Sequence, residues 1–152
     1  MTKKTNFKFY YVDVSTALDI PLFKGGLQLG FPSPADDYMA GSIDLNKRLI
    51  KKPSATFFGI ADGDSMEDAY IHDGDLVIVD RSEKVKQGLK ILCCLDGEFT
   101  IKYIHYDKED KNIIWLVPAN KKYKRIKVTQ EMDFRVWGIV TFSITPHIDK
   151  FD

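Results

Sequence analysis

The alternation of apolar and polar residues predicts that most of the chain from Pro53 onward is β-structure. Seven runs rich in branched and aromatic residues are separated by short turns that contain Gly, Asp, Asn or Pro. We expect strands over Ala55–Ile60, Leu76–Val79, Lys90–Leu95, Glu98–Tyr106, Asn112–Val117, Arg125–Val128 and Phe134–Ile144. Asp96-Gly97 is a typical two-residue hairpin turn between the third and fourth of these strands. The expected fold class is therefore mainly β, a curled sheet assembly with one or two short helices near its start.

The first fifty residues carry weaker signals. Phe7–Val14 is aromatic and β-prone, which predicts an edge strand. Short helical segments are expected after it: one turn that stops before Pro21, and two helices that follow an N-cap at Ser33. Their expected ranges are Ser15–Asp19, Ser33–Gly41 and Ser42–Ile50.

Composition is that of an ordinary globular domain. Of the 152 residues, 44% are hydrophobic and 29% charged, which is enough for a real core. The charges of the 22 basic and 22 acidic residues cancel, which argues against non-specific electrostatic binding of nucleic acid. No run has the length of a membrane span, and no signal peptide is expected. Cys93 and Cys94 are adjacent, and neighbouring cysteines bridge only with strain, so we interpret them as reduced structural cysteines of a cytoplasmic protein. We expect no metal, no cofactor and no membrane contact.

One serine lies in a turn between two of the expected strands. The turn contains Gly63-Asp64-Ser65-Met66 and is rich in glycine and aspartate. Such a turn exposes a hydroxyl on a rigid base and leaves backbone N–H groups free beside it. Free N–H groups stabilise an oxyanion, and here we expect them to come from Ser65 and Met66.

A serine hydroxyl needs a base before it acts as a nucleophile. None of the three histidines lies in a recognisable triad motif, and the other known base is a neutral lysine. Lys102 lies on the strand Glu98–Tyr106, among apolar neighbours that lower a lysine pKa. Spacing alone does not single out this pair, because a turn serine and a solvent-facing lysine give the same pattern.

A family resemblance gives the pair its significance. In chain order the matching segments are Pro21-Leu22-Phe23, Gly30-Phe31-Pro32-Ser33-Pro34-Ala35, Asp37-Tyr38, Ile43-Asp44-Leu45-Asn46, Pro53-Ser54-Ala55-Thr56, Gly63-Asp64-Ser65-Met66, Asp73-Gly74-Asp75-Leu76, Ile78-Val79-Asp80 and Asp96-Gly97-Glu98-Phe99-Thr100. From about Pro21 to its last strand, the chain resembles the UmuD-like group of the LexA-like self-cleaving serine peptidases. The resemblance implies a LexA/signal-peptidase-like domain in which Ser65 is the nucleophile and Lys102 the base.

The resemblance also aligns Leu27-Gln28-Leu29-Gly30 with the self-cleavage site of the family. It implies cleavage of the Leu29–Gly30 bond, which separates an extended N-terminal arm, residues 1–29, from a peptidase and dimerisation domain, residues 30–152. Glycine after the bond lets the backbone approach the nucleophile closely. Leucine before the bond departs from the small Ala or Cys of the family, so we expect slow cleavage. Whether the arm reaches the Ser65 of its own chain or of a dimer partner stays open.

Partners follow from the resemblance alone. It implies a homodimer of the SOS response, cleavage stimulated by RecA on single-stranded DNA, and a shortened form that serves as accessory subunit of an error-prone Y-family translesion DNA polymerase, beside a UmuC-like subunit. One alternative is a non-cleaving interaction module with the same fold, which Leu29 favours. Another is a stand-alone repressor-type regulator. The segment before the cleavage site is too short for a helix-turn-helix domain, so no sequence-specific DNA binding is expected.

Two further segments have more than one interpretation. The run Asn120–Lys127, whose basic residues lie within Lys121–Lys127 and which includes Tyr123, suits DNA or an acidic partner. The zero net charge favours a solvated hairpin loop instead. Phe134–Val140 is apolar on both faces, which fits a dimer interface, although a buried core strand explains the pattern better.

Overall fold

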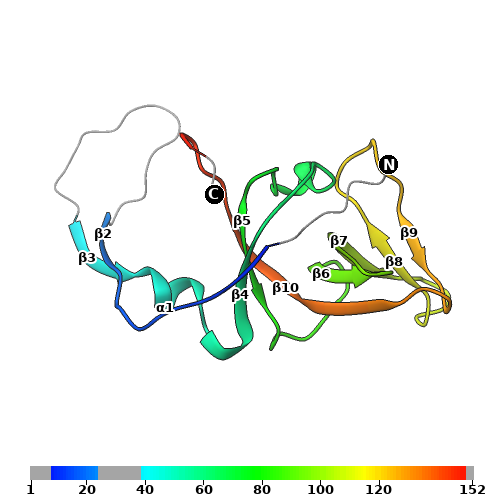
Figure 1. Cartoon of the computed structure of the whole chain (residues 1–152), viewed down its shortest axis with the longest axis horizontal. Coiled ribbons are helices and arrows are strands. Elements are labelled where there is room, and N and C mark those ends of the chain that lie inside the picture. Colours follow the sequence, from blue (N-terminus) through cyan, green and yellow to red (C-terminus); the bar gives the residue numbers. More distant parts are fainter. Residues whose placement is uncertain (1–7, 24–38, 150–152) are drawn as a thin grey trace. The chain divides into compact units, whose positions relative to one another are not determined.

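The computed structural model of the chain is mainly β, as the pattern predicts (Figure 1). It describes residues 8–23 and 39–149. Contacts divide the chain into two units: Asp13–Pro53, and a larger unit made by Met1–Val12 together with Ser54–Asp152. The expected boundary between residues 29 and 30 lies outside the described residues.

An eight-stranded antiparallel sheet forms the larger unit, in the order β1-β4-β5-β10-β6-β7-β8-β9. Its strands are β1 (Phe9–Tyr11), β4 (Thr56–Ile60), β5 (Leu76–Asp80), β6 (Lys90–Leu95), β7 (Glu98–Tyr106), β8 (Ile114–Val117), β9 (Ile126–Val128) and β10 (Phe134–Ile144). All seven strands expected after Pro53 are confirmed, because branched and aromatic residues in short runs leave few alternatives to a pleated sheet. The edge strand expected within Phe7–Val14 is confirmed as the shorter β1.

The Asp96-Gly97 hairpin turn is also confirmed. Both residues have positive φ, 49° at Asp96 and 82° at Gly97, as a tight turn between antiparallel strands requires. Leu95 then pairs with Glu98, and the register continues along β6 and β7 until Lys102 lies opposite Ile91. The turn therefore determines which face of β7 carries Lys102.

Strand β10 runs through the middle of the sheet, between β5 and β6, and Figure 1 shows it as a long strand. Its buried residues Gly138 and Ile139 pair with Leu92 and Ile91 of β6, and Ile139 also pairs with Asp80 of β5. Apolar residues on either side belong to two core clusters, one around Val77, Val79 and Leu92 and one around Ile91, Ile104 and Leu116. The core-strand interpretation thus accounts for the apolar run Phe134–Val140.

Gly138→Ala is expected to destabilise the protein by about 2–3 kcal/mol, because close packing leaves no room for a methyl group. A Cβ there would lie 2.9 Å from the Asp80 carbonyl oxygen and 2.7 Å from a Val79 methyl carbon. Urea unfolding measures the loss, with Arg135→Ala on the exposed side of the same strand as the control. Equal stability of the two variants would show that β5 and β10 are not packed this closely.

The smaller unit differs from the sequence-based expectation. It contains the antiparallel pair β2 (Asp19–Phe23) and β3 (Met39–Asp44), followed by the short helix α1 (Leu45–Leu49). The expected helix over Ser42–Ile50 is therefore wrong for its first three residues, and residues 39–41 of the helix expected from Ser33 are strand. The rest of that helix lies outside the described residues.

Asp44 explains where α1 begins. Its carboxylate accepts a hydrogen bond from the Asn46 backbone N–H at 3.0 Å, which makes it the N-cap. The same carboxylate accepts from the Leu18 N–H at 3.3 Å. The helical turn expected over Ser15–Asp19 is wrong: Ser15 N–H bonds to the Asp13 side chain, and Asp19 already pairs with Asp44 in the strand ladder. No helix among the described residues has the length and apolarity needed to span a bilayer.

Candidate active site

The turn that carries Ser65 connects β4 to β5 and is closed at its base by backbone hydrogen bonds. Ala61 N–H donates to the Asp75 carbonyl at 2.8 Å, and Gly74 N–H donates back to the Ala61 carbonyl at 2.8 Å. Inside the turn, Gly63 adopts φ +99° and its N–H donates to the Asp73 carboxylate at 2.9 Å. Glycine is favoured here because other residues rarely adopt this φ.

The loop after β8 holds the other side of the turn. Ala119 N–H donates to the Ser65 carbonyl at 2.8 Å, and the Ala119 carbonyl accepts from Asp68 N–H at 2.8 Å. The Asn120 side-chain amide donates to the Asp64 carbonyl at 2.8 Å. Ser65 is therefore fixed from both sides by backbone contacts, and sequence reasoning missed this role because the two loops lie far apart along the chain.

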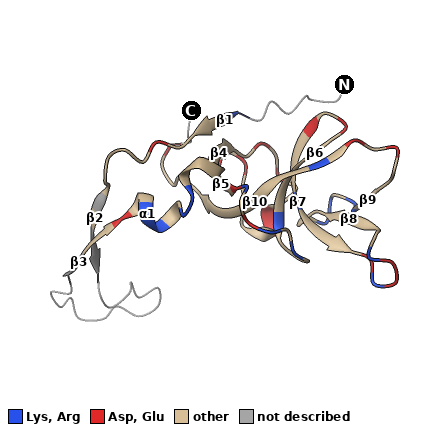
Figure 2. Cartoon of the chain, turned by 90° about the horizontal axis from the view of Figure 1, so that it is seen from below, with Lys and Arg blue, Asp and Glu red and all other residues tan. Residues whose placement is uncertain are grey.

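The basic run Asn120–Lys127 begins in this loop, which connects β8 to β9 as a hairpin. The expected hairpin is present, and the loop is also anchored to the Ser65 turn, while contact of this run with DNA or an acidic partner stays a prediction. The Tyr123 hydroxyl donates to one Asp64 carboxylate oxygen at 2.5 Å, while Lys122 Nζ lies 3.4 Å from the other. The Tyr123 hydrogen bond lowers the pKa of Asp64 and raises that of Tyr123. Figure 2 shows basic and acidic residues in separate short segments along the whole ribbon.

Ser65 and Lys102 lie in contact. Lys102 Nζ is 2.9 Å from Ser65 Oγ, although the two residues are 37 positions apart. The lysine is only 7% exposed. Its Nζ also lies 2.6 Å from Thr100 Oγ1 and 3.0 Å from the Ile101 carbonyl oxygen. The structure thus brings the two predicted side chains together and adds a third, Thr100.

Burial lowers the pKa of Lys102, because water no longer stabilises the ammonium form. Cys93 opposes this shift weakly. Burial raises the pKa of the Cys93 thiol itself to about 12, so at neutral pH the thiol carries no charge that would stabilise an ammonium. Among the described residues, no carboxylate forms an ion pair with Lys102. The environment therefore favours the neutral amine.

The three contacts of Lys102 fit the three N–H donors of an ammonium, and they equally fit a neutral amine, which has two N–H donors and one lone pair. In the neutral form, the amine donates two of these bonds and accepts the third. The Ile101 carbonyl only accepts hydrogen bonds, and the Thr100 hydroxyl is free to accept the other. The lone pair is then left for the Ser65 hydroxyl. Thr100 lies two residues before Lys102 on the same face of β7, so strand periodicity was a signal that could have identified it.

Two backbone donors beside Ser65 have no partner in the part of the chain that the structure describes. They are the N–H groups of Ser65 and Met66, the pair expected from the sequence. The next five residues, Glu67–Ile71, all donate to backbone carbonyls. The free pair can therefore bind an anionic oxygen formed next to Ser65 Oγ. The remaining predicted site residues, Leu29 and Gly30, lie outside the described residues.

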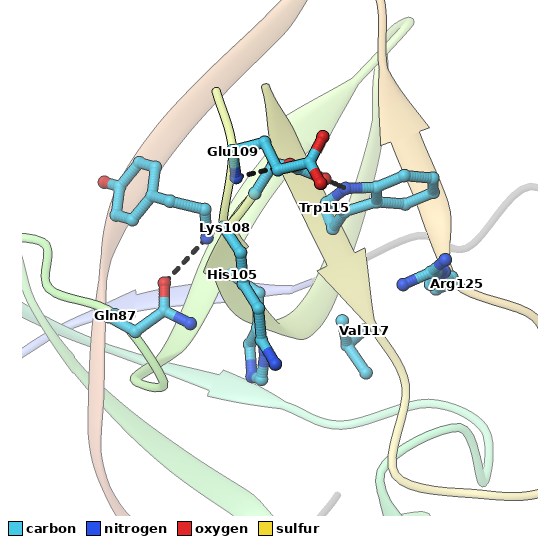
Figure 3. Close-up of a pocket in the computed structure, with 9 residues that line it drawn as sticks. Gln87, His105, Lys108, Glu109, Trp115, Val117 and Arg125 are labelled. Carbon is cyan, nitrogen blue, oxygen red and sulfur yellow. Dashed lines mark hydrogen bonds between the residues drawn. The ribbon is translucent and has the colours of Figure 1, made fainter. Parts of the chain in front are cut away.

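A separate hollow of about 450 Å³ lies over β7 and β8 (Figure 3). Gln87, Trp115 and Arg125 are among the residues that line it, and Arg125 lies over the Trp115 ring at 4.0 Å. Trp115 Nε1–H donates to the Asp107 carboxylate at 3.1 Å. Neither Ser65 nor Lys102 lines this hollow, so it is no part of the Ser65–Lys102 site.

Comparison with known proteins gives a consistent result. The model of the Peptidase S24-like family matches residues 21–141. The protein SamA of Salmonella typhimurium is 41% identical over 121 residues, which cover 80% of this chain and 81% of SamA. MucA of Escherichia coli is 35% identical over 84% of this chain and 86% of MucA. The LexA repressor of Oleidesulfovibrio alaskensis is 34% identical over 76% of this chain and 54% of the repressor.

The family match includes Ser65, Lys102 and every strand from β4 to β9. The mainly β fold agrees with it. The chain therefore belongs to the Peptidase S24-like family of serine peptidases and to its UmuD-like group.

Proposed function

We propose that the protein is a self-cleaving serine peptidase that cuts its own Leu29–Gly30 bond, with Ser65 as nucleophile and Lys102 as general base. The observation that carries the proposal is the 2.9 Å contact between a buried lysine nitrogen and the turn hydroxyl. The lowered Lys102 pKa and the free N–H pair beside Ser65 support it.

The proposed reaction proceeds in two halves. The Ser65 proton passes to the neutral Lys102 amine while Ser65 Oγ bonds to the Leu29 carbonyl carbon, and the resulting oxyanion accepts hydrogen bonds from the Ser65 and Met66 N–H groups. Lys102 then gives its proton to the Gly30 nitrogen, the Leu29–Gly30 bond breaks, and an ester of Leu29 with Ser65 remains. A water molecule loses a proton to Lys102 and attacks that ester. Lys102 returns the proton to Ser65 Oγ as the ester bond breaks, and the Leu29 carboxylic acid is released and ionises.

Alkaline incubation of the purified chain tests the proposal. Cleavage produces fragments 1–29 and 30–152, so intact-mass spectrometry is expected to show both, in equal amounts, at a rate that rises with pH. A chain that stays whole at high pH would favour the non-cleaving interaction module to which Leu29 points.

Thr100→Val is expected to slow cleavage by about 10- to 100-fold, because small errors in positioning a reacting group have effects of this size. Valine has the shape of threonine but no hydroxyl to accept from Lys102 Nζ, so the amine loses one of the two acceptors that orient it. Single-turnover rates of cleavage measure the effect. Thr100→Ser keeps the hydroxyl and should recover most of the rate; a slow serine variant would mean that Thr100 acts through packing.

The cellular role belongs to the same proposal. We propose that the shortened form acts in the cytoplasm as a homodimer and as accessory subunit of a Y-family translesion polymerase, and that RecA on single-stranded DNA stimulates the cleavage. Membership of the UmuD-like group supports this role. Co-purification with a UmuC-like polymerase subunit, compared between fragment 30–152 and an uncleaved Ser65→Ala chain, tests it: binding that does not depend on cleavage would contradict it.

A further inference from the structure

Strand β1 lies within residues 1–29, yet it is part of the large sheet. Phe9, Tyr10 and Tyr11 pair with Gly59, Phe58 and Phe57 of β4, which makes β1 the edge of the sheet. Without β1, the edge would be β4, with a row of unpaired backbone N–H and C=O groups. This inference rests on the proposed cleavage, because that cleavage would remove β1 from the chain.

Phe9 packs against three aromatic rings, here called the aromatic box, and remains 38% exposed. Its ring stacks on Trp137 at 5.5 Å and meets the edges of Phe57 at 5.4 Å and Phe99 at 4.8 Å. The three rings of the box come from β4, β7 and β10, and Trp137 contacts each of the other two, so the large sheet forms the box without help from the arm. Tyr11, two residues further along β1, is 98% exposed. Phe9 is therefore the side chain that anchors β1.

The two features together match a known mode of peptide binding. An extended segment adds a strand to an open sheet edge, where backbone hydrogen bonds give affinity and a pocket for one side chain gives specificity. Here β4 supplies the edge, and the rings of Phe57, Phe99 and Trp137 supply the contacts for one aromatic side chain. The arm itself shows which ligand fits, namely a short extended strand with an aromatic side chain at the position of Phe9.

We propose that the edge of β4 and the aromatic box form a binding site for an extended strand of a partner protein that carries an aromatic anchor residue. The arm occupies this site in the uncleaved chain. Loss of residues 1–29 opens it, since the anchor Phe9 leaves together with β1. Cleavage thus changes which strand covers β4.

A test in the full chain, with cleavage blocked, measures strand binding independently of the proposed cleavage. All variants carry Ser65→Ala, so that the arm stays attached, and Phe9→Asp is added to release β1 from the box. Tyr11→Asp is the matched control, because it places the same charge on the same strand at an exposed position. The probe is a fluorescent peptide with the sequence of residues 6–14, and fluorescence anisotropy measures its binding. A second peptide has an unrelated β-branched sequence with phenylalanine at the same register.

We expect both peptides to bind the Phe9→Asp chain at least tenfold more tightly than the Tyr11→Asp chain. Peptides with aspartate in place of the phenylalanine should not bind. Absence of binding to a Phe9→Asp chain whose circular dichroism and melting temperature are unchanged would overturn the proposal. Binding of the arm sequence alone, without the unrelated peptide, would also overturn it, because the site would then serve only the arm. If Phe9→Asp unfolds the chain, Phe9→Ala replaces it with the same expected order of affinities.

Discussion

Ser65→Ala is expected to abolish cleavage of the Leu29–Gly30 bond and to leave the fold intact. Loss of the nucleophile from a serine peptidase costs roughly a millionfold in rate, which places the reaction below detection. The side-chain hydroxyl makes one contact among the described residues, with Lys102 Nζ, so its removal breaks little that holds the turn together. The hydrogen bonds that the Ala119 N–H and the Asn120 side-chain amide donate to the Ser65 and Asp64 carbonyls remain.

Intact-mass spectrometry after alkaline incubation measures this effect. Ser54→Ala, an exposed serine in the same unit of the chain, is the matched control and should cleave at the wild-type rate. If the Ser65→Ala chain, purified in the same way and free of other proteases, still produced fragments 1–29 and 30–152, Ser65 would not be the nucleophile.

Lys102→Met is expected to stop cleavage as completely, because the Ser65 proton then has no acceptor. In the wild-type protein the base is the neutral amine, whose fraction rises tenfold per pH unit below the Lys102 pKa and levels off above it. Burial lowers that pKa from its ordinary value of 10.5, so the rise in rate should end below pH 10.5. Rates of cleavage across this pH range measure the profile, and a flat profile would exclude Lys102 as the base.

The pH dependence of the free energy of unfolding provides a second test of Lys102→Met. Between the lowered pKa in the folded chain and 10.5 in the unfolded chain, the unfolded state binds more protons at Lys102. The free energy of unfolding should therefore rise with pH across that window, and Lys102→Met should remove this part of the rise. Lys84→Met, at an exposed position, should leave both the cleavage and the pH dependence unchanged.

Much of the large sheet could be predicted from local sequence. The run Leu76–Val79 and the turn Asp96-Gly97 each allow few other structures, so strands and register near them followed directly. The region around Ser42–Ile50 was different, because its apolar residues fit a helix and a strand equally well. Pairing with Asp19–Phe23, a segment distant in sequence, decides in favour of a strand up to Asp44.

The residues of the candidate site show the same contrast between what the sequence predicts and what depends on contacts between distant segments. Ser65 and Lys102 could be named because the family resemblance supplied a pairing that spacing alone does not. Thr100 was open to prediction from strand periodicity, because it lies two residues before Lys102 on the same strand. Ala119 and Asn120 could not be named, since their contacts depend on a loop that follows β8. A residue that acts by holding another in place leaves little trace in a single sequence.

The central claim is that an uncharged Lys102 amine faces the Ser65 hydroxyl. Carbon-13 NMR of the wild-type protein with labelled lysine side chains, with the Lys102 signal assigned by its loss in Lys102→Met, measures the pKa of this amine directly. The account predicts a titration below the ordinary lysine value of 10.5 and coincident with the rise in cleavage rate. A Lys102 signal that titrates at or above 10.5 would contradict it.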